Sequence, residues 1–211
     1  MASKSKQLAL PQPPTHGGKR EGAGRKRRLP RAELPHRARP GLDETKPLHV
    51  TLRMTSRTYS LRSARSARVI ERSLHAGIRR DGLRVVQVSV QGNHVHLLVE
   101  ADGKDALSRG MRGLAIRLAK GMNRMMGKPG RVIADRYHAR PLRTPTEVRT
   151  VMHYLRHNHR HHVPLVASDF IDRFVASTVQ GASCTFLAAP TLWLVKVGWR
   201  RGRVMQLLDS A

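Results

Sequence analysis

The chain has little cysteine, few aromatic residues and no long apolar run. Cys184 is the only cysteine, so no internal disulfide can form, which indicates a reducing compartment. No apolar run approaches the ~20 residues that a membrane-spanning helix needs, and no apolar segment follows the basic start as in a secretory signal. With 39% hydrophobic and 4% aromatic residues, the 211 residues suit one compact domain with tails. These shortages argue against a membrane partner and against a secreted, disulfide-stabilised domain.

Acidic residues are also scarce. The chain holds 40 Lys and Arg against 14 Asp and Glu, which gives a formal net charge of +26. Self-repulsion of this size destabilises a compact chain unless a polyanion usually lies nearby. Because a membrane surface is disfavoured, we expect the partner to be nucleic acid.

The basic residues divide the chain into three parts. Residues 1–45 form a Pro- and Gly-rich basic arm, which we expect to be flexible. Residues 46–162 carry the clear hydrophobic periodicity and are expected to fold as the functional domain, whereas residues 163–211 are expected to form a poorly defined tail. The arm is either a solvated tail or a DNA-binding arm. In the second case its phosphate contacts would come from Lys19, Arg20, Arg25, Lys26, Arg27 and Arg28.

Hydrophobic periodicity predicts the order β-α-β-β-α-β-α within the domain. The predicted strands lie at 48–54, 84–91, 94–100 and 131–142, and the predicted helices at about 65–80, at 105–126 and from Pro145 onward. Thr144 as N-cap and Glu147 three residues later predict a capping box at the start of the third helix. The order predicts an α+β fold, a ferredoxin-like split βαβ antiparallel sheet with helices on one face, plus an extra C-terminal helix.

The dipeptide Gly-Asn at 92–93 predicts a two-residue hairpin between two strands, with the glycine at positive φ. Such a turn places Gln91 opposite His94 and Ser89 opposite His96. The register of the hairpin therefore follows from the turn.

Side-chain alternation then separates two faces of the hairpin. His94 and His96 share a polar face, which we expect to stay open because the helices should cover the apolar face. Two imidazoles one strand repeat apart can hold a divalent metal ion, and a pair of surface histidines is the alternative. The polar face also carries Gln87, Ser89 and Gln91, and the apolar face carries Val86, Val88, Val90, Val95, Leu97 and Val99.

The third helix carries a tyrosine and an amide on one shoulder of its apolar stripe. Tyr154 and Asn158 are four residues apart and are therefore neighbours on the helix surface. If the stripe docks against the domain, both side chains face the same target. Tyr154 is alternatively an amphipathic aromatic at a helix edge, and Asn158 a residue that favours a helix end. Tyr137, expected on the last strand, is the rival nucleophile, although no residue suited to a metal follows four positions later.

Four strings of residues carry a resemblance to a known family. GNHVHLLVE (92–100) resembles the signature of HUH endonucleases, in which two His flank an apolar residue on a central strand. HYLRHN (153–158) resembles the catalytic helix of single-tyrosine HUH transposases, in particular the REP-associated tyrosine transposases. HVTLR (49–53) and DRYHAR (135–140) are also similar to that family.

The resemblance covers about residues 46–162 and implies a metal-dependent DNA transposase. It implies that Tyr154 attacks single-stranded DNA near hairpins or palindromes and forms a 5′-phosphotyrosine, without ATP. It also implies that Asn158 joins His94 and His96 as a ligand of Mg²⁺ or Mn²⁺.

Several points stay open beside this resemblance. The chain departs from the family pattern at 159–162, where HRHH stands in place of the usual Asn-Pro ending. Arg112 and Arg117 on the second predicted helix are expected to contact the DNA backbone, unless they belong to a solvated face. We expect a cytoplasmic, nucleoid-associated protein, either a monomer or a homodimer. The alternative function is a non-catalytic nucleic-acid-binding regulator on the same scaffold. A replication initiator or relaxase is a second alternative, but such enzymes usually need a larger chain or a helicase partner, so the short chain favours a transposase.

Overall fold

The computed structural model describes residues 41–78, 82–158, 170 and 172–204. The chain divides into two units, 1–35 and 36–211, and all the described residues belong to the second. The expected DNA contacts of the basic arm therefore lie outside the described residues. Within the described ranges, no helix is long and apolar enough to cross a membrane.

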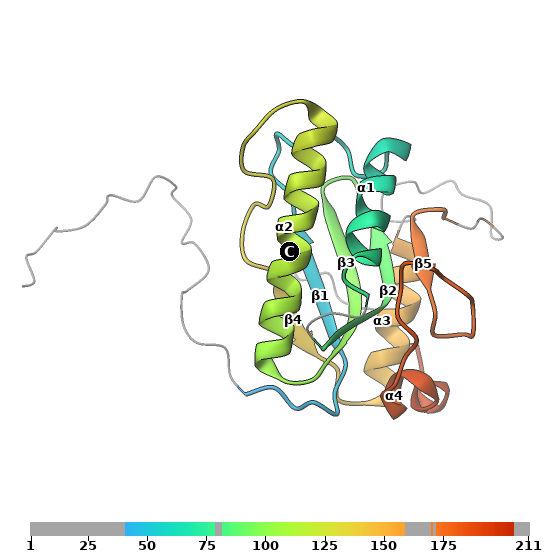
Figure 1. Ribbon diagram of the computed structural model, residues 1–211. Coiled ribbons are helices and arrows are strands. Elements are labelled where there is room, and N and C mark those ends of the chain that lie inside the picture. The colour runs from blue at the N-terminus through green and yellow to red at the C-terminus, as the bar shows by residue number, and fades with distance from the viewer. Residues whose placement is uncertain (1–40, 79–81, 159–169, 171, 205–211) are drawn as a thin grey trace, which may run out of the picture. The chain divides into compact units, whose positions relative to one another are not determined.

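A five-stranded antiparallel sheet forms the centre of the domain (Figure 1). Its strands are β1 (Leu48–Arg53), β2 (Leu83–Val90), β3 (His94–Ala101), β4 (His138–Pro141) and β5 (Val175–Ser177). The strand order is β4-β1-β3-β2-β5. The first four strands have the order and antiparallel pairing of a ferredoxin-like split βαβ sheet, which confirms the predicted fold class.

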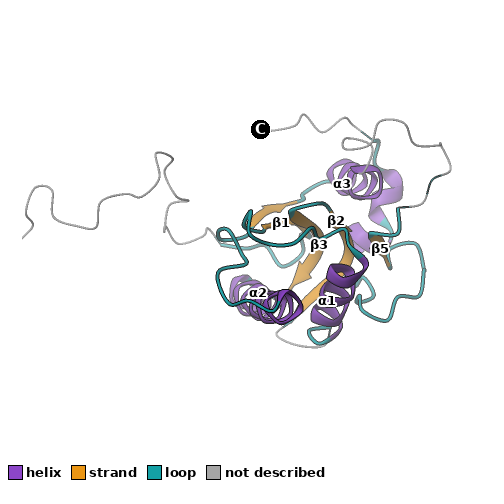
Figure 2. Cartoon of the chain, turned by 90° about the horizontal axis from the view of Figure 1, so that it is seen from above, coloured by secondary structure: helices purple, strands orange, loops and turns teal. Residues whose placement is uncertain are grey.

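Helices lie on both faces of this sheet (Figure 2). Helices α1 (Ala64–His75) and α2 (Lys104–Met126) pack on one face, and α3 (Pro145–His157) packs on the other. The prediction that the polar face of the hairpin stays open was wrong, because α3 covers it. Gln87 is buried there and its Nε2 donates to Met152 O of α3 at 3.1 Å.

A β-bulge in β2 changes which hairpin residues face α3. The pairing moves from Val85–Val99 to Gln87–Leu98, so Val86 has no partner in the regular alternation. Val86 is buried with Leu98 in the core cluster beside α3. The prediction that Val86 lies beneath α1 and α2 was therefore wrong. The other apolar hairpin residues lie there as predicted: Val88, Val90, Val95, Leu97 and Val99.

The turn between β2 and β3 has the predicted pairing but a different backbone. Gln91 N donates to His94 O at 2.9 Å, so these two residues lie opposite each other as predicted. Gly92 is not among the described glycines with positive φ. Leu61 N donates to Gly92 O at 2.9 Å, which shows that neighbouring backbone helps to hold the turn. The local dipeptide could not predict this tertiary support.

Helix α2 has nearly its predicted length, whereas α1 ends at His75 rather than near residue 80. Two glycines of α2 allow its close approach to other elements. A Cβ at Gly110 would lie 2.5 Å from Leu83 Cβ, and one at Gly121 would lie 2.6 Å from Val69 Cγ1. These glycines therefore permit close packing of α2 on β2 and on α1.

Helix α3 begins where the sequence predicts. Thr144 Oγ1 accepts a hydrogen bond from Glu147 N at 3.2 Å, and Glu147 Oε2 accepts one from Thr144 N at 3.1 Å. This capping box fixes the first turn of α3. Strand β4 before it occupies only 138–141 of the predicted 131–142.

The segment 163–211, which we expected to form a poorly defined tail, has described residues that pack on the domain. Its described residues form β5, the short helix α4 (Trp193–Lys196) and the 3-10 helix η2 (Gly198–Arg201). Asp172 forms a bidentate ion pair with Arg62, with distances of 2.8 and 2.9 Å. Buried Glu100 of β3 accepts a hydrogen bond from Thr191 N at 2.9 Å. Buried polar contacts of this kind have no signature in the sequence.

Candidate active site

Two histidines of β3 lie on the face of the sheet that α3 covers. Alternation along β3 sends Val95 and Leu97 to the other face, so His94 and His96 share this one. The centroids of the two imidazole rings are 4.7 Å apart and the ring planes lie at 90°. His96 is buried, with 6% of its surface exposed, and His94 is half-buried. Both imidazoles thus occupy one face, as alternation predicts.

Tyr154 reaches this histidine pair from α3. Its ring centroid lies 5.4 Å from that of His96, and the ring planes meet at 80°. The capping box fixes the start of the helix, and the buried stripe of Val148, Val151 and Leu155 docks it against the sheet. The half-buried Tyr154 is therefore held on the shoulder of α3 that faces β3.

His49 of β1 is a third imidazole in this group, and the sequence analysis did not single it out. Its Nε2 lies 3.2 Å from His96 Nδ1, and Thr51 Oγ1 lies 3.2 Å from the same nitrogen. The His49 ring centroid lies 6.2 Å from that of Tyr154. His49 and Thr51 thus approach His96 from the neighbouring strand.

The electrostatic setting of His49 keeps its imidazole neutral. Burial, together with electrostatic repulsion from the neighbouring Arg140 and His138 side chains, lowers the pKa of His49 to about 4. The sequence carried a signal for this residue, because His49 alternates with the buried Leu48 and Val50 along β1. Combined with the adjacency of β1 and β3 in the predicted sheet, that alternation would have placed His49 beside the β3 histidines.

Asn158 is the C-cap residue of α3, one turn beyond Tyr154. It is buried, with 3% of its surface exposed, and its Nδ2 makes no hydrogen bond with any residue in the described ranges. Buried amides normally have hydrogen-bond partners. The atom without a partner is an N–H donor, which a water molecule or an anionic oxygen would complete, whereas a metal ion would bind this amide through Oδ1.

The donor groups present here fit a divalent ion held by nitrogen and amide ligands. Among residues 41–78, 82–158, 170 and 172–204, no group of three or more His, Cys, Asp or Glu side chains is arranged to hold a metal ion. The family resemblance implies His94, His96 and the amide of Asn158 as the ligands of an ion at this site. Nitrogen ligands suit Mn²⁺ and related ions, whereas Mg²⁺ would rely more on water and phosphate oxygens.

Tyr137, the rival nucleophile, packs with the core on the other face of the sheet. It is half-buried against the cluster beneath α1 and α2. Tyr154 packs instead against the cluster beside α3. The arrangement thus separates Tyr137 from His94 and His96.

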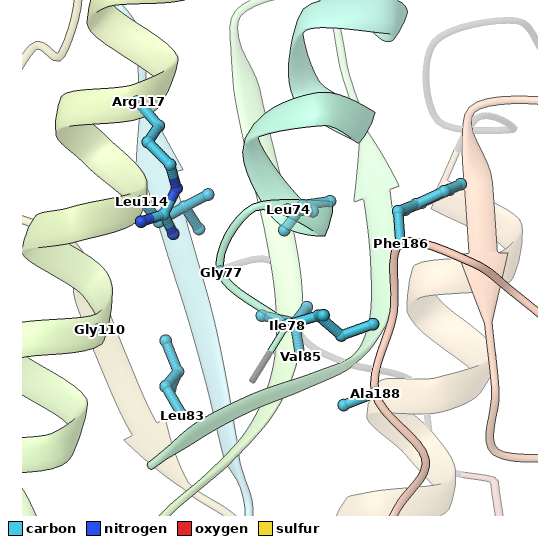
Figure 3. A pocket seen from close by; sticks show the side chains of 10 residues that line it. All are labelled: Leu74, Gly77, Ile78, Leu83, Val85, Gly110, Leu114, Arg117, Phe186 and Ala188. Carbon is cyan, nitrogen blue, oxygen red and sulfur yellow. The ribbon is translucent and has the colours of Figure 1, made fainter. Parts of the chain in front are cut away.

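Arg112 and Arg117 both lie on α2, across the sheet from Tyr154. Arg112 is exposed. Arg117 is half-buried, its side chain points into the space between α2 and the end of α1 (Figure 3), and its Nε donates to Ser73 O at 2.9 Å. The structure therefore brings neither arginine to the group formed by Tyr154 and the histidines.

The chain is similar to a known protein family and to solved structures. The family model described as "Transposase IS200 like" matches residues 45–158. A REP-associated tyrosine transposase bound to a REP hairpin superposes with a TM-score of 0.51 and 14% identity, over 62% of this chain and 75% of that one. A putative transposase from Deinococcus radiodurans R1 gives a TM-score of 0.40 and 17% identity, over 59% of this chain and 95% of that one. No curated protein matches the chain.

Proposed function

The chain belongs to the IS200-like transposase family, and we propose that it cleaves and rejoins single-stranded DNA near hairpins or palindromes with Tyr154 as nucleophile. One observation carries the proposal: the centroid of the Tyr154 ring lies 5.4 Å from the centroid of the buried His96 ring. A capped, docked helix thus holds a phenol beside two imidazoles, and such pre-positioning lowers the entropic part of a reaction barrier. Tyr137 packs with the other core and supports no comparable arrangement.

The proposed step exchanges one phosphate ester for another. Tyr154 Oη loses its proton to water and forms a bond with a phosphorus atom of the DNA strand. The bond between that phosphorus and the 3′ oxygen breaks, and the oxygen takes up a proton to leave as a 3′-OH. The 5′ side stays attached to the protein as a 5′-phosphotyrosine. A 3′-OH that attacks such a linkage reverses the exchange, so rejoining needs no ATP.

A divalent ion, Mg²⁺ or Mn²⁺, would be held by His94, His96 and Asn158. When bound, the ion would neutralise charge on a non-bridging phosphate oxygen and assist departure of the 3′ oxygen. His49 and Thr51 would orient His96 through its Nδ1, which leaves Nε2 as the ligand atom. This role follows from the contacts of the two β1 side chains with a single ring nitrogen.

The proposed substrate is single-stranded DNA that folds into a hairpin. The formal charge of +26 supports a polyanionic partner. The structural neighbour at TM-score 0.51 was solved with a REP hairpin, and we extend that class of ligand to this chain. The proposed DNA contacts are basic side chains of the arm and two arginines of α2. They are Lys19, Arg20, Arg25, Lys26, Arg27 and Arg28 in the arm, and Arg112 and Arg117 in α2.

The test is a denaturing gel with a labelled single-stranded hairpin. We expect a protein–DNA band that survives heating, needs Mg²⁺ or Mn²⁺, and is lost in excess chelator and in the His94→Ala/His96→Ala variant. The matched control is His153→Ala/His157→Ala, which removes another imidazole pair, with ring centroids 4.0 Å apart on α3. If the wild type gives no band on any palindromic substrate with metal present, a nucleic-acid-binding regulator on the same scaffold becomes the better description.

A further inference from the structure

The two tryptophans of the chain lie in α4 and η2, beyond the residues that match the family model. Helix α4 lies beside α3 (Figure 1) and buries Leu194 and Val195 in the core cluster there. Trp193 of the same helix stays outside, with 52% of its surface exposed. We call residues 191–203 the C-terminal platform. Because tryptophan is enriched at interfaces, a ring left in solvent on this platform suits a binding surface.

The surface of the C-terminal platform carries charge of one sign. Residues 173–204 contain no Asp or Glu. In the part of the chain that the structure describes, the four cations of the platform form no ion pair with an acidic residue. All four are exposed: Lys196, Arg200, Arg201 and Arg203. A solvated face usually mixes both signs, whereas a surface with cations alone suits a polyanion.

Two of these cations lie over the tryptophan rings. Arg201 Cζ is 5.5 Å from the ring centroid of Trp193, and Arg200 Cζ is 5.8 Å from that of Trp199. Both distances fall within the range of about 6 Å for a cation–π interaction. Proteins that bind single-stranded nucleic acid stack bases on aromatic rings and pair phosphates with cations beside them. Since the base faces of a duplex are already stacked on one another, an exposed ring favours a single strand.

The C-terminal platform is fixed to the domain at both ends. Before α4, Glu100 of β3 accepts a hydrogen bond from Thr191 N at 2.9 Å. After η2, Arg149 Nη1 of α3 donates to Gly202 O at 2.9 Å. A surface that is held in place before a ligand arrives loses less conformational entropy on binding.

The C-terminal platform lies next to the helix that carries Tyr154. Trp199 and Tyr154 both pack against the core cluster beside α3. Gly202 contacts the start of α3 closely, because a Cβ there would lie 2.3 Å from Pro145 O. From Pro145 to Tyr154 the helix rises about 13.5 Å, since each residue adds 1.5 Å. A short single-stranded segment next to Tyr154 can therefore reach the platform.

We propose that the C-terminal platform binds single-stranded DNA, with a base stacked on Trp193 and backbone phosphates paired with Arg200 and Arg201. The proposal rests on the proposed function for the identity of the nucleic acid, because a strand cleaved at Tyr154 has a single-stranded flank close by. The cations beside the ring favour this occupant over an apolar surface of another protein.

Substitutions at Trp193 test the stacking, with the full-length protein and a labelled, unstructured oligothymidylate. Trp193→Ala should weaken binding about 5- to 150-fold, the range expected for one stacked base. Trp193→Phe keeps an aromatic ring and should retain most of the affinity, whereas Trp193→Leu should bind as weakly as Trp193→Ala. Ile116→Ala, at an apolar side chain of α2 that is 49% exposed, is the control and should bind like the wild type. Wild-type affinity in Trp193→Ala, or equal affinity of the Phe and Leu variants, would overturn the proposal.

Tryptophan fluorescence reports the same contact directly. Trp199→Phe leaves Trp193 as the only tryptophan of the chain, and saturating oligothymidylate should quench its emission. Trp193→Phe leaves only Trp199, which is half-buried and should respond less. Anisotropy of the labelled DNA shows when the protein is saturated. Unchanged Trp193 emission at saturation would mean that the strand binds elsewhere, against the proposal.

Two double variants with equal charge change test the phosphate contacts. Arg200→Gln/Arg201→Gln removes two cations of the platform, and Lys104→Gln/Arg109→Gln removes two exposed cations of α2. For oligothymidylate, the platform variant should decrease the magnitude of the negative slope of log K against log salt by about 1.4, because each single-strand phosphate contributes about 0.7. The α2 variant should keep the wild-type slope. Equal slopes for the two variants would contradict the proposed phosphate contacts.

The covalent protein–DNA band separates this proposal from the proposed function. If the wild type forms no band but Trp193→Ala still weakens oligothymidylate binding, the proposed chemistry fails while the platform stands. If the band forms and Trp193→Ala binds oligothymidylate like the wild type, the platform fails while the proposed function stands.

Discussion

His49 Nε2 lies 3.2 Å from His96 Nδ1, so β1 contacts the ring nitrogen of His96 that would not bind the ion. The pKa of about 4 keeps His49 neutral at pH 7, and a neutral imidazole can accept a hydrogen bond from His96 Nδ1. That bond would fix the tautomer in which His96 Nε2 carries the lone pair. Partners of this kind commonly change metal affinity by about 10- to 100-fold.

We therefore expect His49→Ala to weaken Mn²⁺ binding by about 10- to 100-fold while the fold is kept. The measurement is Mn²⁺ titration followed by electron paramagnetic resonance, without DNA. His49→Gln keeps an acceptor and should restore part of the affinity. His138→Ala, which removes an exposed imidazole of β4, is the control and should bind like the wild type. Equal Mn²⁺ affinity in His49→Ala and wild type would show that His49 does not orient a ligand.

Glu100 should be a strong contributor to stability. Its fully buried carboxylate accepts hydrogen bonds from Thr191 N, Thr191 Oγ1, Leu192 N and Arg84 Nε. Glu100→Gln replaces an acceptor oxygen with an N–H donor among these donors, so it should lower the free energy of unfolding by about 2–3 kcal/mol. Urea denaturation measures the change.

Asp102→Asn is the matched control for Glu100→Gln. Asp102 also pairs with Arg84, at 2.7 Å, but 58% of its side chain is exposed. An exposed ion pair contributes only about 0–1 kcal/mol, so this change should lower the unfolding free energy by less than about 1 kcal/mol. Equal effects of the two substitutions would mean that the contacts of Glu100 with the 191–192 segment are not stabilising.

The local patterns of the chain predicted the central fold well. Alternation along β1 and β3 and the capping box at Thr144 depend on neighbouring residues only, and the structure shows both. The bulge at Val86 was missed because it adds one residue to one strand, which a period-two pattern does not reveal. Strand β5 was missed because its three residues gain stability from pairing with β2 rather than from their own sequence.

Local spacing groups the residues of the candidate site only where one strand or one helix carries them. His94 and His96 share a strand, and Tyr154 and Asn158 share a helix, so spacing alone groups each pair. His49 joins them through the pairing of β1 with β3, which is a long-range contact.

Thr144→Ala should lower the free energy of unfolding by about 1 kcal/mol, because it removes the hydroxyl that accepts from Glu147 N. Thermal unfolding followed by circular dichroism measures the loss. Thr185→Ala, at an exposed threonine of a loop, should change stability little. The same loss in both variants would argue that the cap is not responsible.

Removal of residues 1–40 should weaken DNA binding and lower its salt dependence. This part of the basic arm holds 11 Lys and Arg and two Glu. For every phosphate that the truncated protein no longer neutralises, the magnitude of the negative slope of log K against log salt should decrease by about 0.9. A full-length variant with Gln at Lys19, Arg20, Arg25, Lys26, Arg27 and Arg28 distinguishes charge from chain length. An unaltered slope in both would mean that the arm does not bind the DNA backbone.

Tyr154→Phe should abolish covalent attachment to DNA while hairpin binding and stability stay close to wild type. The substitution removes only the phenolic oxygen, and the ring that lies 5.4 Å from His96 remains to pack. Tyr137→Phe is the matched control, because it makes the same chemical change at a ring that packs with the other core. The measurement is the heat-stable protein–DNA band on a denaturing gel, with binding measured separately by fluorescence anisotropy. We expect Tyr137→Phe to keep the band, since its ring is remote from the histidine pair. If Tyr154→Phe still formed the band and Tyr137→Phe did not, Tyr137 would be the nucleophile, and the reaction would take place away from His94 and His96.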